Sequence, residues 1–302
     1  MKTVSVDGYE LICDEHPDGL YVTGYEGAGA VLDLTGHFEI TGMDKKAFLC
    51  CRSVRRIYLP DSIRYMGDWC FSKCDNLESV DMEGDFAQIS FGRGVFSGCE
   101  ALEKIGFKDT DESASRLLAA AVSRMSNDMF LRSDDMGEKS WYEKWDISFL
   151  SMLSDDGRSD ISGAVSGEED VSYDGVASVD GEMPGASDDH IKSMAKSKCA
   201  LCFLRLSLNA HLSSARADSI RTYIRERAFG TANDVAWTTV KEAGEKAMDY
   251  LQIYLSVIDP DKDVTGHMIR DLNSSNVQIR ACLIDRAGED RDLSAAFDEL
   301  LL

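Results

Sequence analysis

Residues 71–82 read Phe71-Ser72-Lys73-Cys74-Asp75-Asn76-Leu77-Glu78-Ser79-Val80-Asp81-Met82, and this stretch decides the fold. Its apolar residues stand three apart from Phe71 to Val80 and then two apart at Met82. The same spacing recurs in residues 48–59 and 96–107, at intervals of 23 and 25 residues. The matching positions are Phe48, Cys51, Val54, Ile57 and Leu59 upstream, and Phe96, Cys99, Leu102, Ile105 and Phe107 downstream. Agreement across three copies indicates an internal repeat.

Each copy changes its period partway along. Steps of three suit a tight helical or 3₁₀ turn that directs one face inward. The closing alternation suits a short strand with one buried face. One such unit is too small to enclose its apolar face, so the units must stack. Stacking predicts a buried, reduced ladder of Cys51, Cys74 and Cys99, and a serine at position 74 is expected to bury a hydroxyl without a partner.

The residues between copies add a second shared feature. Gly67 and Gly92 precede the repeat phenylalanine by four residues and follow the bulky apolar residues Met66 and Phe91. With this feature, residues 20–108 resemble the BspA-type leucine-rich repeats of bacteria, whose units read IxxIGxxAFxxCxxLxxVxIP. The first unit departs from that pattern at Asp44, and the third has Gly94-Val95 before its phenylalanine. The resemblance implies a leucine-rich-repeat solenoid over residues 37–108. Residues 1–36, with a turn at His16-Pro17-Asp18-Gly19, are expected to form an N-terminal cap with an atypical first repeat.

The rest of the chain has helical periodicity. Residues 109–153 are expected to form a helical segment and residues 191–302 an all-α domain, which makes the fold class α+β. The expected helices cover residues 111–124, 139–153, 191–206, 213–224, 235–243, 246–258, 264–272, 277–285 and 293–301. Trp141-Tyr142-Glu143-Lys144-Trp145-Asp146 and Cys202-Phe203-Leu204-Arg205-Leu206 resemble the region after the repeats in uncharacterised leucine-rich-repeat proteins of gut Firmicutes. That resemblance implies no activity.

Charge divides the chain further. The formal net charge is -22, and Asp155 to Asp189 holds eleven acids and one base. Residues 154–190 are therefore expected to form an acidic, mobile linker. Binding to duplex DNA or to an anionic membrane needs clustered cations, so neither partner is expected.

Few residues suggest chemistry. The weak metal candidates are Asp155, Asp156, Glu168, Glu169 and Asp170, whose mutual repulsion a hard cation would relieve. A solvated acidic loop is the commoner origin of such a run, and a metal-dependent hydrolase is the alternative. We expect no cofactor and no catalytic residue.

Three other motifs have simpler explanations. Cys199-x2-Cys202 has redox or zinc spacing but no partner pair, so both residues are expected to pack in a core. Asp259, Asp261 and Asp263 resemble part of a calcium loop without its final acid, which favours an acidic turn with an N-cap before Val264. Arg270-Asp271-Leu272 imitates a kinase catalytic loop without its companion motifs and is expected to be a helix end.

Cysteine usage gives an expectation about location. The sequence starts with charged and polar residues and shows no apolar stretch of a secretion signal, and it contains nine cysteines. Many cysteines without an export signal are typical of reduced thiols, so the cytoplasm is expected.

The expected function is that of a non-catalytic scaffold. Outward strand positions of stacked repeats line up as one face, as repeat proteins use for partners. The candidate partner-binding residues are Arg56, Tyr58, Ser79, Asp81 and Lys104. Arg52, Arg55, Arg56 and Arg64 add a local basic patch. A protein partner of unknown identity is therefore expected.

Overall fold

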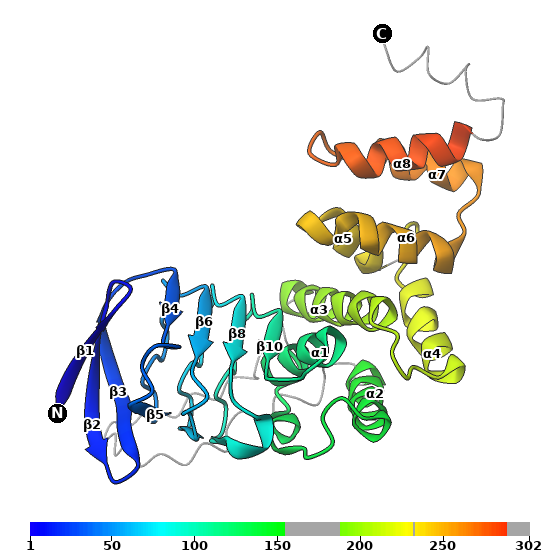
Figure 1. Cartoon of the computed structure of the whole chain (residues 1–302). Helices are drawn as coiled ribbons and strands as arrows, with labels where there is room; N and C mark the ends of the chain where they lie inside the picture. The colour runs from blue at the N-terminus through cyan, green and yellow to red at the C-terminus, as the bar shows by residue number, and fades with distance from the viewer. Residues whose placement is uncertain (155–187, 232, 289–302) are drawn as a thin grey trace, which may run out of the picture. The chain divides into compact units, whose positions relative to one another are not determined.

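The computed structural model describes residues 1–154, 188–231 and 233–288, and within them the chain divides into two compact units. The first unit comprises residues 1–149 with residues 210–212, and the second begins at residue 150 and holds the remaining helices. Stacked strands dominate the first unit and α-helices the second (Figure 1). The predicted α+β class is confirmed. The expected linker lies, but for its ends, outside the described residues.

An antiparallel three-stranded hairpin system opens the first unit. It consists of β1 (Lys2–Val6), β2 (Tyr9–His16) and β3 (Gly19–Gly27). The predicted turn after His16 joins β2 to β3, and alternation along both strands buries Leu11, Cys13 and Val22. Strand β3 then pairs in parallel with β5 (Ile40–Met43), so the hairpins continue directly into the repeats.

Two sheets form the sides of the solenoid, and their strands pair in parallel except for the antiparallel β1, β2 and β3. The order of one is β1-β2-β3-β5-β7-β9, and that of the other is β10-β8-β6-β4. The remaining strands are β4 (Val31–Asp33), β6 (Arg56–Leu59), β7 (Tyr65–Met66), β8 (Ser79–Met82), β9 (Ser90–Phe91) and β10 (Lys104–Gly106). The chain alternates between the sheets, so each coil adds one strand to each side. Strand β4, within the expected cap, already pairs with the repeat strand β6.

The steps of three form tight turns, as predicted. The Cys51 N–H donates to Phe48 O at 3.0 Å, and the N–H groups of Cys74 and Cys99 make the equivalent bonds at 3.4 and 3.2 Å. Further bonds join successive coils: the Phe48 N–H donates to Cys70 O at 2.8 Å. Each turn thus satisfies its backbone groups both within its own coil and against the next.

Two side-chain ladders run through the solenoid core. Phe48, Phe71 and Phe96 stack with ring centroids 5.1 and 5.9 Å apart, and all three are fully buried. Cys51, Cys74 and Cys99 lie beside them as buried free thiols. The predicted burial of the cysteine ladder is confirmed.

One expectation about this ladder is wrong. The Cys74 thiol donates to Phe48 O at 3.2 Å, and the Cys99 thiol donates to Phe71 O at 3.0 Å. A backbone acceptor is therefore available to a hydroxyl at position 74. We expect Cys74→Ser and Cys74→Ala to lower the free energy of unfolding by similar amounts, on the order of 1 kcal/mol, because the serine can keep the hydrogen bond. Urea denaturation of both variants measures this, and a serine variant weaker than the alanine variant by 2 kcal/mol or more would contradict the observed contact.

Helix α1 (Glu112–Ser123) follows β10 and packs against it. Its N-cap is Asp111, whose Oδ1 accepts from the Ala114 N–H at 2.8 Å. The 3₁₀ turn η2 (Asp128–Arg132) and helix α2 (Lys139–Ser154) come next. The Trp145 Nε1–H of α2 donates to Leu117 O at 2.9 Å, which fixes α2 to α1.

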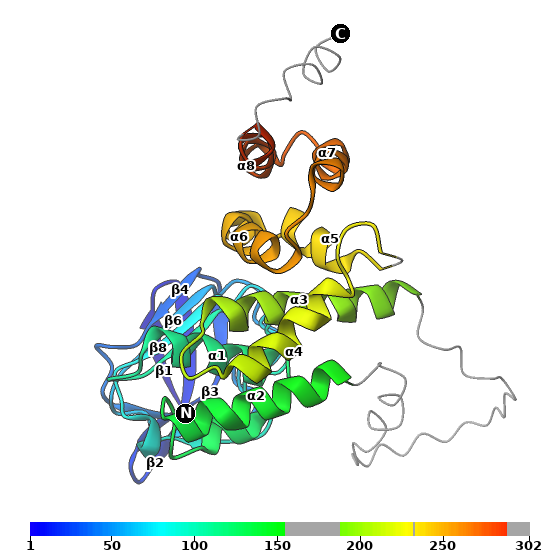
Figure 2. The same ribbon diagram turned by 90° about the vertical axis from the view of Figure 1, so that its right-hand side faces the viewer.

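The second unit is a stack of short helices (Figure 2). They are α3 (Asp188–Ser207), α4 (Ser214–Arg225), α5 (Val235–Lys241), the 3₁₀ turn η3 (Gly244–Lys246), α6 (Ala247–Ile258), α7 (Lys262–Asp271) and α8 (Val277–Gly288). Helices α5 and α6 form one layer and α7 and α8 the next. Ser213 caps α4 as predicted, whereas α7 begins two residues early because Asp261 is its N-cap. The helix expected at residues 293–301 lies outside the described residues.

Candidate functional site

The strand register brings the five predicted partner-binding residues onto one face. Arg56 pairs with Ser79 and Ser79 with Lys104, which forms one row across β6, β8 and β10. Tyr58 pairs with Asp81 and Asp81 with Gly106, which forms a second row. Their strand neighbours Ile57, Val80 and Ile105 point the other way and are fully buried. The two rows therefore lie on the outer face of the β10-β8-β6-β4 sheet, which we call the repeat face.

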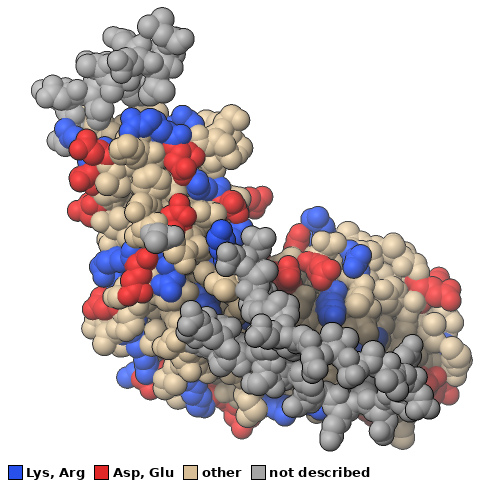
Figure 3. All heavy atoms as spheres, turned by 180° about the vertical axis from the view of Figure 1, so that it is seen from behind, with Lys and Arg blue, Asp and Glu red and all other residues tan. Residues whose placement is uncertain are grey.

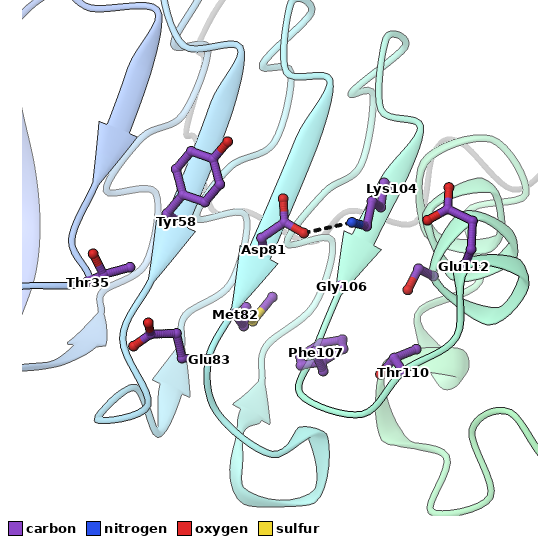
Figure 4. A pocket seen from close by; sticks show the side chains of 11 residues that line it. Thr35, Tyr58, Asp81, Met82, Glu83, Lys104, Gly106, Phe107, Thr110 and Glu112 are labelled. Atoms are coloured by element: carbon purple, nitrogen blue, oxygen red, sulfur yellow. Dashed lines mark ion pairs between the residues drawn. The ribbon is translucent and has the colours of Figure 1, made fainter.

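A pocket of about 230 Å³ lies on the repeat face where it meets the start of α1. Tyr58, Asp81 and Lys104 line it, whereas Arg56 and Ser79 do not. The remaining lining residues come from the strand ends and from α1: Thr35, Met82, Glu83, Gly106, Phe107, Thr110, Glu112 and Ser115. Figure 4 shows the side chains of Tyr58, Asp81 and Lys104 along the upper part of this pocket.

An ion pair crosses two strands in this pocket. Lys104 Nζ lies 3.0 Å from Asp81 Oδ1 (Figure 4). Gly106 makes the diagonal contact possible, because a Cβ there would lie 2.9 Å from the same Asp81 oxygen. The hydrogen bond to Asp81 raises the pKa of Lys104, as do the charges of Asp81 and Glu112, so the amine stays protonated.

Glu83 and Glu112 are pocket residues that sequence reasoning missed. Glu83 follows β8, and Glu112 is the first residue of α1. The repeat pattern carries a signal for the first, one position beyond the inward Met82, but none for the second. Glu112 reaches the pocket only because α1 packs against β10.

Two of the four arginines of the predicted basic patch pair with acids of the next coil. Arg55 pairs with Glu78 at 2.9 Å and Arg52 with Asp75 at 3.8 Å. The Arg64 guanidinium donates to the backbone oxygens of Asp61 and Ile63. Exposed pairs of this kind contribute little stability, but they offset the charge of Arg52 and Arg55.

The alternative of a metal-dependent hydrolase finds no support. Asp155, Asp156, Glu168, Glu169 and Asp170 lie outside the described residues, and within the described residues no group of three or more His, Cys, Asp or Glu could hold a metal ion. Asp259 accepts from Arg286 at 2.5 Å, and Asp261 caps α7.

The remaining motifs have structural roles. Burial raises the pKa of Cys199 to about 12 and that of Cys202 well above its usual value, so neither thiol is poised to ionise. The kinase-like stretch is the end of α7, where Asp271 accepts from Trp237 Nε1 at 2.7 Å and Lys241 Nζ at 2.6 Å.

A second pocket, of about 670 Å³, lies between η2 and α2. One of its lining residues, Asp135, accepts from Ser133 at 2.6 Å, from Ser140 at 2.5 Å and from Lys144 at 2.8 Å. The hydrogen bond from Lys144, followed by those from the serines, holds the pKa of Asp135 well below its usual range. Asp135 therefore has a structural role, because it links Ser133 to Ser140 and Lys144 in the first turns of α2.

A carboxyl group whose pKa is lower in the folded protein than in the unfolded chain stabilises the fold at pH values above its unfolded-state pKa. This stability is lost as the pH falls toward the folded-state pKa. We therefore expect Asp135→Asn to lower the free energy of unfolding on the order of 1 kcal/mol at pH 7, after allowance for solvent screening. The difference from wild type should shrink progressively as pH falls below about 4, where the reference carboxylate protonates. Denaturation curves across this pH range measure it, and a pH-independent difference would assign the loss to packing instead.

Charges are more balanced elsewhere. Residues 191–302 hold sixteen acids and fifteen bases. Figure 3 shows both signs interspersed over the surface of the described helices. Among these helices, none combines the length and apolar character that crossing a bilayer requires.

Residues 33–118 match the model of the BspA type leucine rich repeat region, with six copies. The match starts later than the expected residue 20, because the antiparallel hairpins β1–β3 precede it, and it extends into α1.

Solved structures with similarity to this chain are also leucine-rich-repeat proteins. One from Bacteroides capillosus is 23% identical over 33% of this chain and 78% of its own, with a TM-score of 0.28. A leucine rich cell surface protein from Faecalibacterium prausnitzii is 16% identical over 35% of this chain and 32% of its own, with a TM-score of 0.28. A third, from T. pallidum, is 23% identical over 32% of this chain and 61% of its own, with a TM-score of 0.25. A comparison with curated proteins finds no match. Residues 33–118 of this chain are a BspA-type leucine-rich-repeat region.

Proposed function

We propose that this protein is a non-catalytic interaction module that binds a protein partner through the repeat face. The repeat architecture supports the proposal, because stacked strands present an extended and regular surface. The single observation that carries it is the convergence of Tyr58, Asp81 and Lys104 on one pocket. These side chains are not needed for core packing, which the inward residues supply. Their chemistry is therefore free to serve recognition.

Two tyrosines on opposite sheets provide a matched test. Tyr58 is on β6 of the repeat face, whereas Tyr65 is on β7 of the other sheet, and both are half-buried. Each is replaced by alanine, and the immobilised full chain is used to capture proteins from lysate of the native host. We expect a protein bound by wild type and by Tyr65→Ala to be reduced about ten-fold on Tyr58→Ala, as for a tyrosine at the centre of an interface. Equal capture by all three proteins, or loss only with Tyr65→Ala, would contradict the proposal.

We propose a cytoplasmic location for this module. Seven of its nine cysteines are buried as free thiols, which suits a reducing compartment. Fractionation of host cells with an antibody to the chain tests this directly. Recovery in the surface fraction would instead match the description of the Faecalibacterium prausnitzii protein.

A further inference from the structure

The pocket on the repeat face carries more negative charge than its own cation balances. Asp81, Glu83 and Glu112 line it together with the single cation Lys104. Lys104 already pairs with Asp81. Glu83 and Glu112 are exposed, and within the described residues neither side chain forms an ion pair. The pocket therefore attracts a positively charged group.

The spacing of these carboxylates disfavours a metal ion. A divalent cation needs several oxygen ligands within about 2.6 Å of one point. In the described residues, no three acidic, histidine or cysteine side chains come close enough together for that. Figure 4 shows Glu83 and Glu112 on opposite sides of the pocket, with the Asp81–Lys104 pair between them. A broad organic cation with several donors fits this separation better than a point charge.

The other lining residues suit a long side chain. Met82 and Phe107 add apolar surface that can pack against a methylene stem. Thr110 and Ser115 add hydroxyl-bearing residues to the lining, and a hydroxyl can accept a hydrogen bond as well as donate one. The start of α1 does not require an anion, because Asp111 already caps it.

We propose that this pocket receives an arginine side chain from the partner protein. The planar guanidinium presents five donors on a flexible stem, which matches carboxylates on two sides, a hydroxyl and an apolar lining. The proposal rests on the proposed function, since it names the chemistry of the partner at the same face. It adds that Glu83 and Glu112 recognise the partner's side chain. An interaction surface could exist without this property.

The test uses the full chain and a defined probe. The peptide acetyl-Gly-Arg-Gly-amide is titrated while the amide signals of Tyr58 and Gly106 are followed by NMR, and the neutral isostere with citrulline in place of arginine is titrated in parallel. The double variant Glu83→Gln/Glu112→Gln removes the pocket acids. The control Glu15→Gln/Glu100→Gln removes the same charge from two exposed sites away from the pocket. Calcium chloride tests a simple cation.

We expect saturable shifts of both amides with the arginine peptide and none with the citrulline peptide. Affinity should fall about five-fold or more in the pocket variant and change less than about two-fold in the control, because charges at greater distance are screened. Equal weakening in both variants, or equal shifts with calcium, would overturn the proposal. The arginine proposal and the proposed function can fail separately. If a captured protein is lost with Tyr58→Ala but is still bound by the pocket variant, the interaction module stands and only the arginine proposal is rejected.

Discussion

Phe71→Ala is expected to lower the free energy of unfolding of the first unit by about 3–5 kcal/mol. Phe71 is the central ring of the phenylalanine ladder and stacks on Phe48 at 5.1 Å and on Phe96 at 5.9 Å. It is fully buried, so removal of the ring leaves a cavity between two coils. The two coils cannot close this cavity without moving the rest of the stack. Because whole-domain stability is typically about 5–15 kcal/mol, the variant should be close to unfolding at 37 °C.

The measurement should report on the first unit alone, since the helical unit can unfold separately. Alkylation of Cys74 and Cys99 in increasing urea, read by mass spectrometry, does this because both thiols are buried in the folded unit. Phe38→Ala is the matched control: Phe38 is 60% exposed, and its loss should change stability by no more than about 0.5 kcal/mol. Equal urea midpoints for the two variants would show that the ladder does not hold the coils together.

Gly67→Ala is the second large effect. A Cβ at Gly67 would lie 2.5 Å from the backbone N of Lys45 and 2.7 Å from the carbonyl carbon of Asp44. These are backbone atoms of the preceding coil, which cannot rotate aside as a side chain could. The added methyl must push the coils apart and weaken the bond from the Gly67 N–H to Met43 O, now 2.8 Å long. We expect a loss of about 3 kcal/mol, at the upper end for overpacking.

Gly84→Ala separates this steric effect from a general effect of glycine replacement. A Cβ at Gly84 would have Asp61 Cα at 3.6 Å as its nearest neighbour, an ordinary contact. Its stability, measured by the same alkylation assay, should stay within about 1 kcal/mol of wild type. A comparable loss in both variants would mean that the close approach at Gly67 is not the reason why this position lacks a side chain.

The sequence alone determined the repeat and its inward residues. Phe71, Cys74, Leu77 and Val80 are all fully buried, as their spacing predicts. This succeeds because the direction of a side chain in a tight turn or a strand depends on local backbone geometry, which the period of apolar residues reports directly. The outward row containing Tyr58 and Asp81 follows from the same alternation. Helix starts were less certain, since Asp261 and Asp263 are equally good caps by sequence and the structure uses the first.

Only the tertiary structure decided which polar groups meet. Glu112 joins Lys104 at the pocket because α1 packs beside β10, and no local pattern encodes that position. Glu78 neutralises Arg55 from the following coil, 23 residues away. The backbone oxygen of Phe48 accepts from Cys74 across 26 residues, which reverses the expectation for a serine there. Charge balance and hydrogen-bond satisfaction depend on distances between coils, and those distances exist only once the coils have stacked.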